Sequence, residues 1–179
     1  GIDDVDIIQT KLGGVDSYLH LDAALFGGYL QALPFSSHIS NASHGKRRYD
    51  SIAISFHKFF GYPSVAGLFA TNVTNFEAFR DVFAAVHDPA YISHVPGTIT
   101  CSRDPVKPAE LHYFTHKDSL LLQKKDARSI LENTSYLSAE MRSNFPDLVP
   151  RRAGDVSNIV YFKNNISTKL VKDWNLATI

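Results

Sequence analysis

Three short apolar runs constrain the fold of this chain most, because each has the length of a strand and ends beside polar or small residues. They span residues 18–24, 50–55 and 65–71. Apolar residues at helical spacing occupy residues 3–12, 75–86 and 109–144. Strands mixed with helices at this spacing predict an α/β layered domain. The second and third runs are too close in sequence for a helical crossover, so we expect them to pair antiparallel.

The chain becomes richer in helical pattern after about residue 115. The periodicity over residues 109–144 is interrupted near Lys117 and Asp118, which predicts two helices. A further strand is expected at residues 156–162 and another helix from residue 168 to 177. The polar composition of residues 36–48 predicts a loop between the first two strands. The sequence therefore predicts an α/β domain followed by a smaller, helix-rich segment.

Composition and charge exclude several classes of protein. The 179 residues carry 18 basic and 18 acidic side chains, so the zero net charge gives no sign of a nucleic-acid partner or an anionic membrane surface. A hydrophobic share of 44% is enough for an ordinary globular core. No run approaches the roughly 18 apolar residues that suggest a membrane span. The single cysteine, Cys101, excludes an internal disulfide and suits a reducing compartment, so we expect a cytoplasmic protein.

Two residues of opposite charge, Asp22 and Lys58, follow two of the predicted strands. Ligands of open α/β sheets bind beyond the carboxyl ends of strands, so both side chains could face one pocket. Lys58 is flanked by Phe56, Phe59 and Phe60, and partial desolvation by aromatic rings favours the neutral amine that a Schiff base needs. A turn-capping acid at Asp22 and a solvated surface lysine at Lys58 are the alternatives.

These two segments carry a resemblance to a known family. Residues 18–24, reading YLHLDAA, and residues 50–59, reading DSIAISFHKF, resemble the group II pyridoxal-phosphate-dependent amino-acid decarboxylases of fold type I. The most similar branch holds the histidine decarboxylases and plant-type serine decarboxylases, in which D-A-A or D-A-G ends one strand and S-x-H-K carries the cofactor lysine. Similar segments follow at residues 98–103, 131–137 and 157–162. The chain departs from that branch at Cys101 and at Asp104–Pro105, where the branch has glycine.

The resemblance implies a fold and its division. Residues 1–115 would be the C-terminal part of the large cofactor-binding domain, with a mixed, mostly parallel sheet and helices. Residues 116–179 would form a long helix and the start of the smaller α+β C-terminal domain. The family's phosphate-cradling turn and ring-stacking residue precede the D-A-A motif, whereas 21 residues precede Asp22 here. We therefore expect a fragment that lacks the N-terminal part and the extreme C-terminus of its protein. Such a fragment would be inactive alone, with an incomplete sheet, an exposed apolar patch and an open cofactor pocket.

The resemblance also implies roles for five residues. Lys58 would hold pyridoxal 5'-phosphate covalently until the substrate amine displaces it. Asp22 would pair with the protonated pyridine nitrogen, which keeps the ring able to accept electrons. Ala24 would lie against one face of the ring. Ser55 and His57 would hydrogen-bond the phosphate, for which a hydroxyl and an imidazole are suitable donors.

The implied activity is decarboxylation of an L-amino acid to a primary amine, with histidine as the first choice of substrate and a homodimer as the assembly. Serine, aromatic or acidic amino acids are alternative substrates. A carbon–carbon or carbon–sulfur lyase using the same cofactor is an alternative reaction, although the apolar run 59–63 favours the decarboxylase branch. The third alternative is an inactive, truncated relative that serves as a binding or structural module.

The remaining polar residues are weaker candidates. His20 lies two residues before Asp22 on the same strand, so it could support that aspartate or simply pack in the core. Arg103 could meet an anionic group across a dimer interface or form a surface salt bridge. The other histidines lack a metal-ligand spacing with an accompanying carboxylate, so no metal site is expected. They are His38, His44, His87, His94, His112 and His116.

Overall fold

A computed structural model describes residues 2–33, 39, 42–43, 46–86, 90–91, 103–162 and 166–177. The chain divides into two units, which we describe separately. One is Asp3–Ala127, and the other is Arg128–Ile179 together with residues 1–2. The long helix α5 (Lys117–Asn144) contributes residues to both units.

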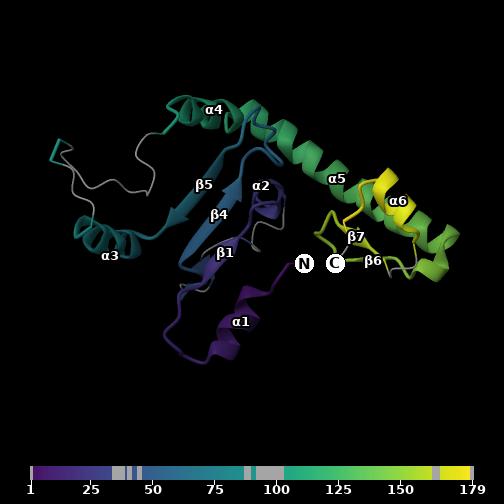
Figure 1. Cartoon of the computed structure of the whole chain (residues 1–179), viewed down its shortest axis with the longest axis horizontal. Helices are drawn as coiled ribbons and strands as arrows, with labels where there is room; N and C mark the ends of the chain where they lie inside the picture. Colours follow the sequence, from purple (N-terminus) through teal and green to yellow (C-terminus); the bar gives the residue numbers. More distant parts are fainter. Residues whose placement is uncertain are drawn as a thin grey trace. The chain divides into compact units, whose positions relative to one another are not determined.

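The centre of the first unit is a sheet with the strand order β1-β4-β5 (Figure 1). Its strands are β1 (His20–Asp22), β4 (Ser51–Ser55) and β5 (Gly67–Thr71). β1 pairs parallel to β4, with Asp22 opposite Ala53. β4 pairs antiparallel to β5, from Ser51 opposite Thr71 to Ser55 opposite Gly67. The predicted antiparallel pair is confirmed, and the sheet is mixed as expected.

β1 is shorter and more exposed than the sequence pattern predicts. A buried strand over residues 18–24 is expected, but the strand covers three residues and both His20 and Asp22 are exposed. The physical reason is the position of β1 at the sheet edge, since its one neighbour in the described sheet is β4. The predicted loop over residues 36–48 also differs in part. Its described residues include two short antiparallel strands, β2 (Ala42–Ser43) and β3 (Lys46–Arg47).

Two helices of this unit begin at a residue whose side chain caps them. Asp4 caps the first of them by accepting from the backbone nitrogens of Asp6 and Ile7, and Gly13 ends it in the left-handed conformation. Asn72 caps the other in the same manner. The predicted break near Lys117 is confirmed, because α4 ends at Phe114 and α5 begins at Lys117. The helices of this unit are α1 (Val5–Leu12), α2 (Phe26–Leu30), α3 (Val73–Ala84), α4 (Val106–Phe114) and the start of α5.

Helix α2 packs closely against one face of the sheet. A Cβ atom at Gly27 would lie 2.8 Å from Ile54 Cγ1 and 2.9 Å from Ala23 Cβ, so this contact requires glycine. On the opposite face, the ring of His20 bonds the Ser51 hydroxyl at 2.7 Å and stacks on Phe69 at 5.9 Å. The two faces therefore differ, since one is covered by α2 and the other carries His20, Asp22 and Phe69, which are all exposed.

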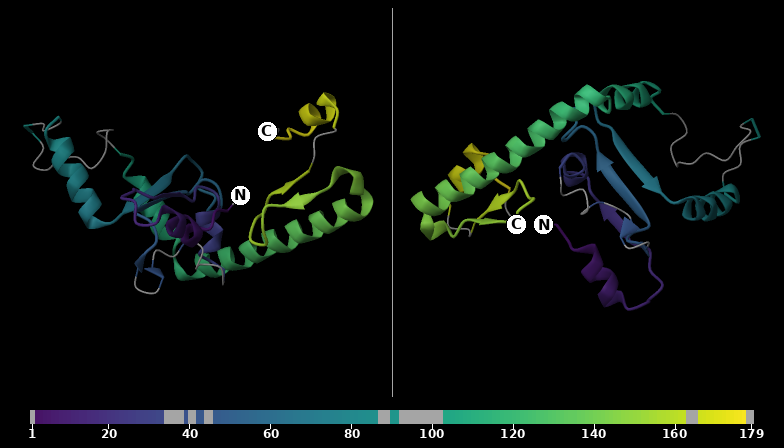
Figure 2. Two further views of the ribbon diagram at one scale, coloured as in Figure 1. Left: turned by 90° about the horizontal axis from the view of Figure 1, so that it is seen from below. Right: turned by 180° about the vertical axis from the view of Figure 1, so that it is seen from behind.

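The second unit folds around the C-terminal part of α5 (Figure 2). A short helix at Pro146–Leu148 leads into a hairpin of β6 (Arg151–Arg152) and β7 (Val160–Tyr161), followed by α6 (Thr168–Asp173). Arg152 joins the hairpin to α5 by donating to the Ser157 carbonyl at 2.6 Å and to the Ser135 hydroxyl at 2.9 Å. The strand predicted at residues 156–162 is thus shorter, and the helix predicted to reach residue 177 ends at Asp173.

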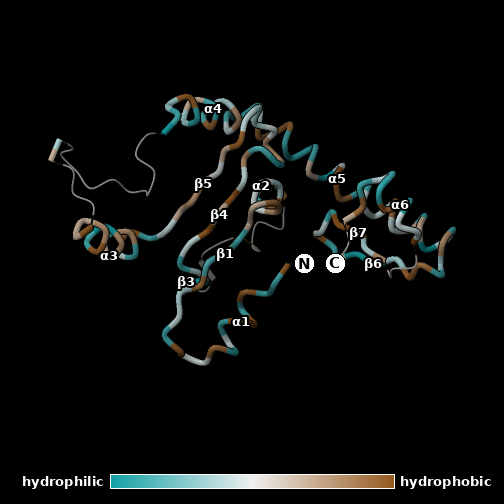
Figure 3. The backbone as a smooth tube through the Cα atoms, in the orientation of Figure 1, coloured by the Kyte–Doolittle hydropathy of each residue, from teal (hydrophilic) through white to brown (hydrophobic). Residues whose placement is uncertain are grey.

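The first unit leaves a large apolar surface open on and beside β5 and α3. Figure 3 colours the hydrophobic residues along these backbone segments brown. The exposed fractions are 84% for Val65, 61% for Phe69 and 71% for Val73. Both Phe76 and Phe79 on α3 are 41% exposed. Exposed apolar surface of this extent marks an interaction site in soluble proteins. An exposed apolar patch is expected around the Asp22 strand, whereas this apolar surface lies along β5 and α3. In the described part of the chain, no helix is long and apolar enough to cross a membrane.

We expect the Phe69→Thr variant of this chain to self-associate less than the parent, because Phe69 belongs to the exposed apolar surface and is itself 61% exposed. Its free energy of unfolding should change by less than about 1 kcal/mol. The matched variant Phe56→Thr empties a buried position and should cost about 3–5 kcal/mol. Light scattering and urea unfolding measure the two effects. Equal stability losses for the two variants would contradict this assignment of the exposed surface.

Candidate functional site

The carboxyl ends of β1 and β4 lie side by side because these two strands are parallel. Backbone hydrogen bonds continue beyond the ladder. The nitrogen of Ala23 donates to the Ala53 carbonyl at 2.9 Å, and the nitrogen of Ser55 donates to the Ala24 carbonyl at 3.1 Å. The structure therefore places the D-A-A segment directly beside the serine that begins S-x-H-K. Three predicted site residues, Asp22, Ala24 and Ser55, are brought together by backbone geometry alone.

The carboxylate of Asp22 has two functions open to it. Its Oδ1 atom accepts a hydrogen bond from the backbone nitrogen of Ala24 at 3.1 Å, which fixes the turn after β1. The side chain is exposed, so the second oxygen can take another donor. The turn-capping alternative is thus observed, and it leaves room for the proposed pairing with a ring nitrogen.

Lys58 lies in the turn that follows β4, and its backbone nitrogen donates to the Ser55 carbonyl at 3.4 Å. Its side chain is exposed, so the expected desolvation by flanking aromatic residues is wrong for this structure. The rings of Phe56 and Phe60 are 6% and 5% exposed and contact each other at 5.4 Å. They turn inward because burial against each other removes more apolar surface from water than covering one lysine would.

His57 is exposed, and its Nδ1 atom lies 3.1 Å from the carbonyl oxygen of Ala66. With Nδ1 as the donor, Nε2 is the nitrogen open to a further partner. Ser55 is half-buried and lies at the end of β4, where its backbone nitrogen bonds to the Ala24 carbonyl. Ser55 is the last residue of β4 and His57 follows it, and both lie within three residues of Lys58.

The sequence reasoning missed the structure that supports the Lys58 turn. Tyr62 stacks on Phe114 of α4, with ring centroids 4.7 Å apart and an interplanar angle of 28°. Phe56, Phe60 and Tyr62 form a buried cluster against which Leu111 and Phe114 pack. The aromatic composition of residues 56–62 was the available signal, but it was interpreted as the environment of the lysine.

A charged contact reinforces this support. Lys107 of α4 donates to the Ser64 hydroxyl and to Glu110 Oε2 at 2.6 Å, and its Nζ atom lies 3.8 Å from Asp104 Oδ2. The spacing of Lys107 and Glu110 on one helix face could have predicted their ion pair. The contact to Ser64, far away in sequence, could not have been predicted this way.

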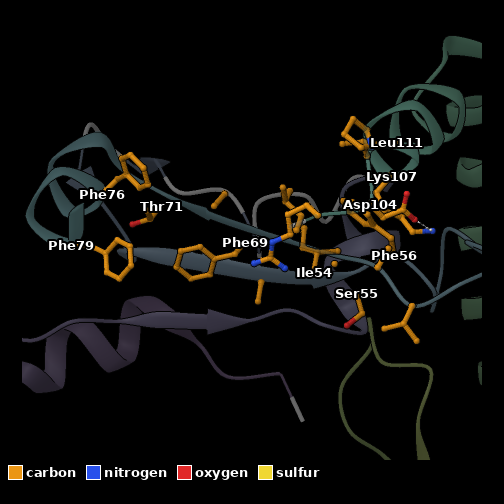
Figure 4. A pocket seen from close by; sticks show the side chains of 18 of the residues that line it. Ile54, Ser55, Phe56, Phe69, Thr71, Phe76, Phe79, Asp104, Lys107 and Leu111 are labelled. Carbon is orange, nitrogen blue, oxygen red and sulfur yellow. Dashed lines mark ion pairs between the residues drawn. The ribbon is translucent and has the colours of Figure 1, made fainter. Parts of the chain in front are cut away.

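A groove borders the β5 side of the sheet. Figure 4 shows Phe69, Phe76 and Phe79 at one end and Lys107 and Leu111 at the other. Arg103 also lines it and is exposed. Among the residues predicted for the site, Ser55 lines this groove. The groove is therefore continuous with the strand end of β4.

Within the described residues, no group of three or more His, Cys, Asp or Glu side chains could hold a metal ion. His112 and His116 are exposed, as expected for surface residues, and His116 lies 3.8 Å from Asp118. His38, His44, His87, His94 and Cys101 lie outside the described residues, as does most of the segment 98–103.

The chemical groups of these side chains are of the types that bind pyridoxal phosphate. A carboxylate suits a protonated ring nitrogen, a primary amine suits an aldehyde, and hydroxyl and imidazole groups suit a phosphate. The parallel strand ends provide all of these within a few residues of one another.

Comparisons with known proteins agree with this arrangement. No family model matches the chain. It is 29% identical over 183 aligned residues to a histidine decarboxylase of Solanum lycopersicum, an alignment that covers 99% of this chain and 41% of that protein. It is 30% identical to serine decarboxylase 2 of Oryza sativa subsp. japonica, over 98% of this chain and 36% of that protein. The chain thus spans about two fifths of the length of these curated relatives.

The structural comparison gives the fold. L-methionine decarboxylase from Streptomyces sp. 590, in its internal aldimine form, matches 89% of this chain and 34% of its own chain. The TM-score is 0.67 and the sequence identity 23%. The fold is therefore that of part of a fold type I decarboxylase. The predicted resemblance is confirmed, because the chain is similar to histidine and serine decarboxylases along almost its whole length.

We expect Tyr62→Phe to be neutral or stabilising near neutral pH, because the buried Tyr62 hydroxyl has no hydrogen-bond partner within the described residues. Burial, and secondly the charge of Glu110, raise the pKa of Tyr62 above its ordinary value of 10.0. The neutral phenol is therefore favoured in the folded state. Its contribution to stability is present below pH 10 and is lost as the pH rises through the higher folded pKa.

Urea unfolding at several alkaline pH values measures this effect. Tyr62→Phe should lose less stability than the parent as the pH rises above the ordinary tyrosine pKa. Part of the loss should remain, because burial also raises the pKa of Tyr49. The control Tyr113→Phe removes a hydroxyl from a ring that is 69% exposed and should behave as the parent does. Identical alkaline curves for Tyr62→Phe and the parent would refute this account.

Proposed function

We propose that the protein containing this chain removes the α-carboxylate of an L-amino acid as carbon dioxide and releases the primary amine, with pyridoxal 5'-phosphate as its cofactor. The observation that carries the proposal is the parallel pairing of β1 with β4, which unites the D-A-A and S-x-H-K segments at one sheet edge. Similarity to decarboxylases over 98–99% of the chain supports it.

The cofactor supplies an electron sink for the pair left behind when the carboxylate departs. The residues of this chain would bind and orient it. Asp22 would keep a proton on the ring nitrogen, and the Lys58 amine would hold the aldehyde carbon covalently between turnovers. Ala24 would leave space for the flat ring. Ser55 and His57 would donate to the phosphate oxygens.

Histidine is the substrate we propose first. Histidine decarboxylases of a plant and of Acinetobacter baumannii both match the chain, the latter at 36% identity over 110 residues. Serine is the next candidate, and aromatic or acidic amino acids follow. A carbon–carbon or carbon–sulfur lyase is the alternative reaction. Assays of amine release from each amino acid, with the gene product that contains this chain, distinguish these possibilities.

We further propose a homodimer in the cytoplasm. The resemblance to fold type I enzymes supports the dimer, and a single cysteine suits a reducing compartment. We also propose that residues 1–115 belong to a large cofactor-binding domain and residues 116–179 to the long helix and the small domain.

A second candidate function is a binding or structural module without turnover. The specific observations in its favour are the exposed Lys58 side chain and the use of Asp22 as a turn cap. A visible absorbance band after addition of pyridoxal phosphate, together with release of carbon dioxide, would favour the enzyme. Absence of both would favour the module.

We expect borohydride reduction of the cofactor-loaded gene product to attach the pyridoxyl group to Lys58. The reason is that Lys58 is the one lysine among the residues placed at this site. Its turn follows β4, whose end lies beside the end of the Asp22 strand. Peptide mapping by mass spectrometry locates the label. A label on Lys46, Lys107 or Lys117 in place of Lys58 would disprove the assignment.

We expect Asp22→Asn to slow turnover by at least about tenfold to a hundredfold, because a charge-assisted bond to the ring nitrogen is lost. The asparagine oxygen can still accept from the Ala24 nitrogen, so the turn should persist and the thermal unfolding midpoint should stay near that of the parent. Asp16→Asn, at an exposed loop acid, is the matched control. An unchanged rate and cofactor spectrum in Asp22→Asn would exclude this role.

A further inference from the structure

We infer that helix α4 holds the Lys58 turn in position and that Lys107 is a positioning residue for the Lys58 amine. The inference rests on the proposed function, since it concerns how the lysine is presented to the cofactor. It is argued from contacts that lie wholly within the unit Asp3–Ala127.

The turn that carries Lys58 is closed by its own backbone. The nitrogen of Phe56 donates to the Ala66 carbonyl at 2.9 Å, and the nitrogen of Tyr62 donates to the Phe56 carbonyl at 3.4 Å. Gly61 has a φ of 70°, in the left-handed region, so the reversal just after Lys58 requires glycine. These bonds set the shape of the turn but leave Lys58 exposed.

Apolar contacts then fix the turn to α4. The ring of Tyr62 is 5.0 Å from that of Phe56 and 4.7 Å from that of Phe114, so it bridges the turn and the helix. Tyr62 is 5% exposed, and Leu111 completes the contact from the same helix. Ring pairs at these distances add to the energy of burial.

Lys107 adds a polar contact between α4 and the turn that carries Lys58. Its side chain is 24% exposed, and that of its partner Glu110 is 19% exposed, so the pair is largely sheltered from solvent. The carboxylates of Glu110 and Asp104 hold the ammonium group, which donates in turn to the Ser64 hydroxyl. Ser64 is two residues beyond Tyr62, so one hydrogen bond holds the far side of the turn.

The aromatic contact at Tyr62 and the hydrogen bond at Ser64 lie on either side of Pro63. Loss of one contact would therefore leave the turn held to α4 by the other alone. Within the described residues the Lys58 side chain has no ion pair of its own. The position of its amine therefore depends on the backbone of the turn, and the backbone of the turn depends on α4. Lys107 would act on Lys58 through this backbone and not by direct contact.

The test compares Lys107→Met with the parent in the cofactor-loaded gene product. Methionine keeps most of the unbranched side chain but lacks the terminal ammonium group, so the charge and the donors are removed. We expect backbone amide exchange in residues 57–66 to rise about twofold to fivefold, the range for a partly exposed charged contact. Borohydride labelling of Lys58 at limiting pyridoxal phosphate should fall by a similar factor. Exchange in β4 should stay at the parent value.

Three further variants make the result decisive. Lys107→Arg keeps a cation and donors, so it should restore both readouts. Lys125→Met removes an exposed lysine of α5 and should match the parent. Phe114→Leu removes the ring that stacks on Tyr62, so it should raise amide exchange in the same residues 57–66.

Unchanged exchange and labelling in both Lys107→Met and Phe114→Leu would overturn the inference. A rise in exchange spread equally over β4 would overturn it as well, because that pattern indicates general destabilisation. If the parent itself carries no label on Lys58, the proposed function fails, and amide exchange alone decides whether α4 holds the turn. The two failures are therefore distinguishable.

Discussion

The parallel hydrogen bonding of β1 to β4 is the interaction on which the candidate site depends. Asp22 and Lys58 are far apart in the sequence, and this pairing brings their strand ends together. The bond from Ser55 to the Ala24 carbonyl extends the pairing beyond the last ladder residue. Since backbone geometry sets this spacing, the side chains at the site can remain exposed without losing their relative order along the edge.

The aromatic residues around Lys58 stabilise the turn that carries it. Phe56, Phe60 and Tyr62 are among the most buried residues of the first unit, and they pack on α4. A lysine beside such rings in sequence can still be exposed, because consecutive side chains of a turn point in different directions. The position of Lys58 is therefore set by the packing of the turn that carries it.

The surface of the first unit shows where further protein contacts would be favourable. β5 and α3 expose large apolar side chains, and β5 has one strand neighbour in the described sheet. The curated relatives extend well beyond the matched segment. The proposed activity is accordingly assigned to the gene product that contains this chain.

Local sequence determined the elements of this protein and the residues of its candidate site. The short connection between two apolar runs predicted the strand pair β4–β5, and the interrupted helical periodicity predicted the break near Lys117, because both depend on neighbours in sequence. The exposure of β1, the inward aromatic cluster and the bond from Lys107 to Ser64 were decided by the tertiary structure. Each of these joins or separates segments that are distant along the chain, and a local pattern holds no information about which distant segment becomes the neighbour.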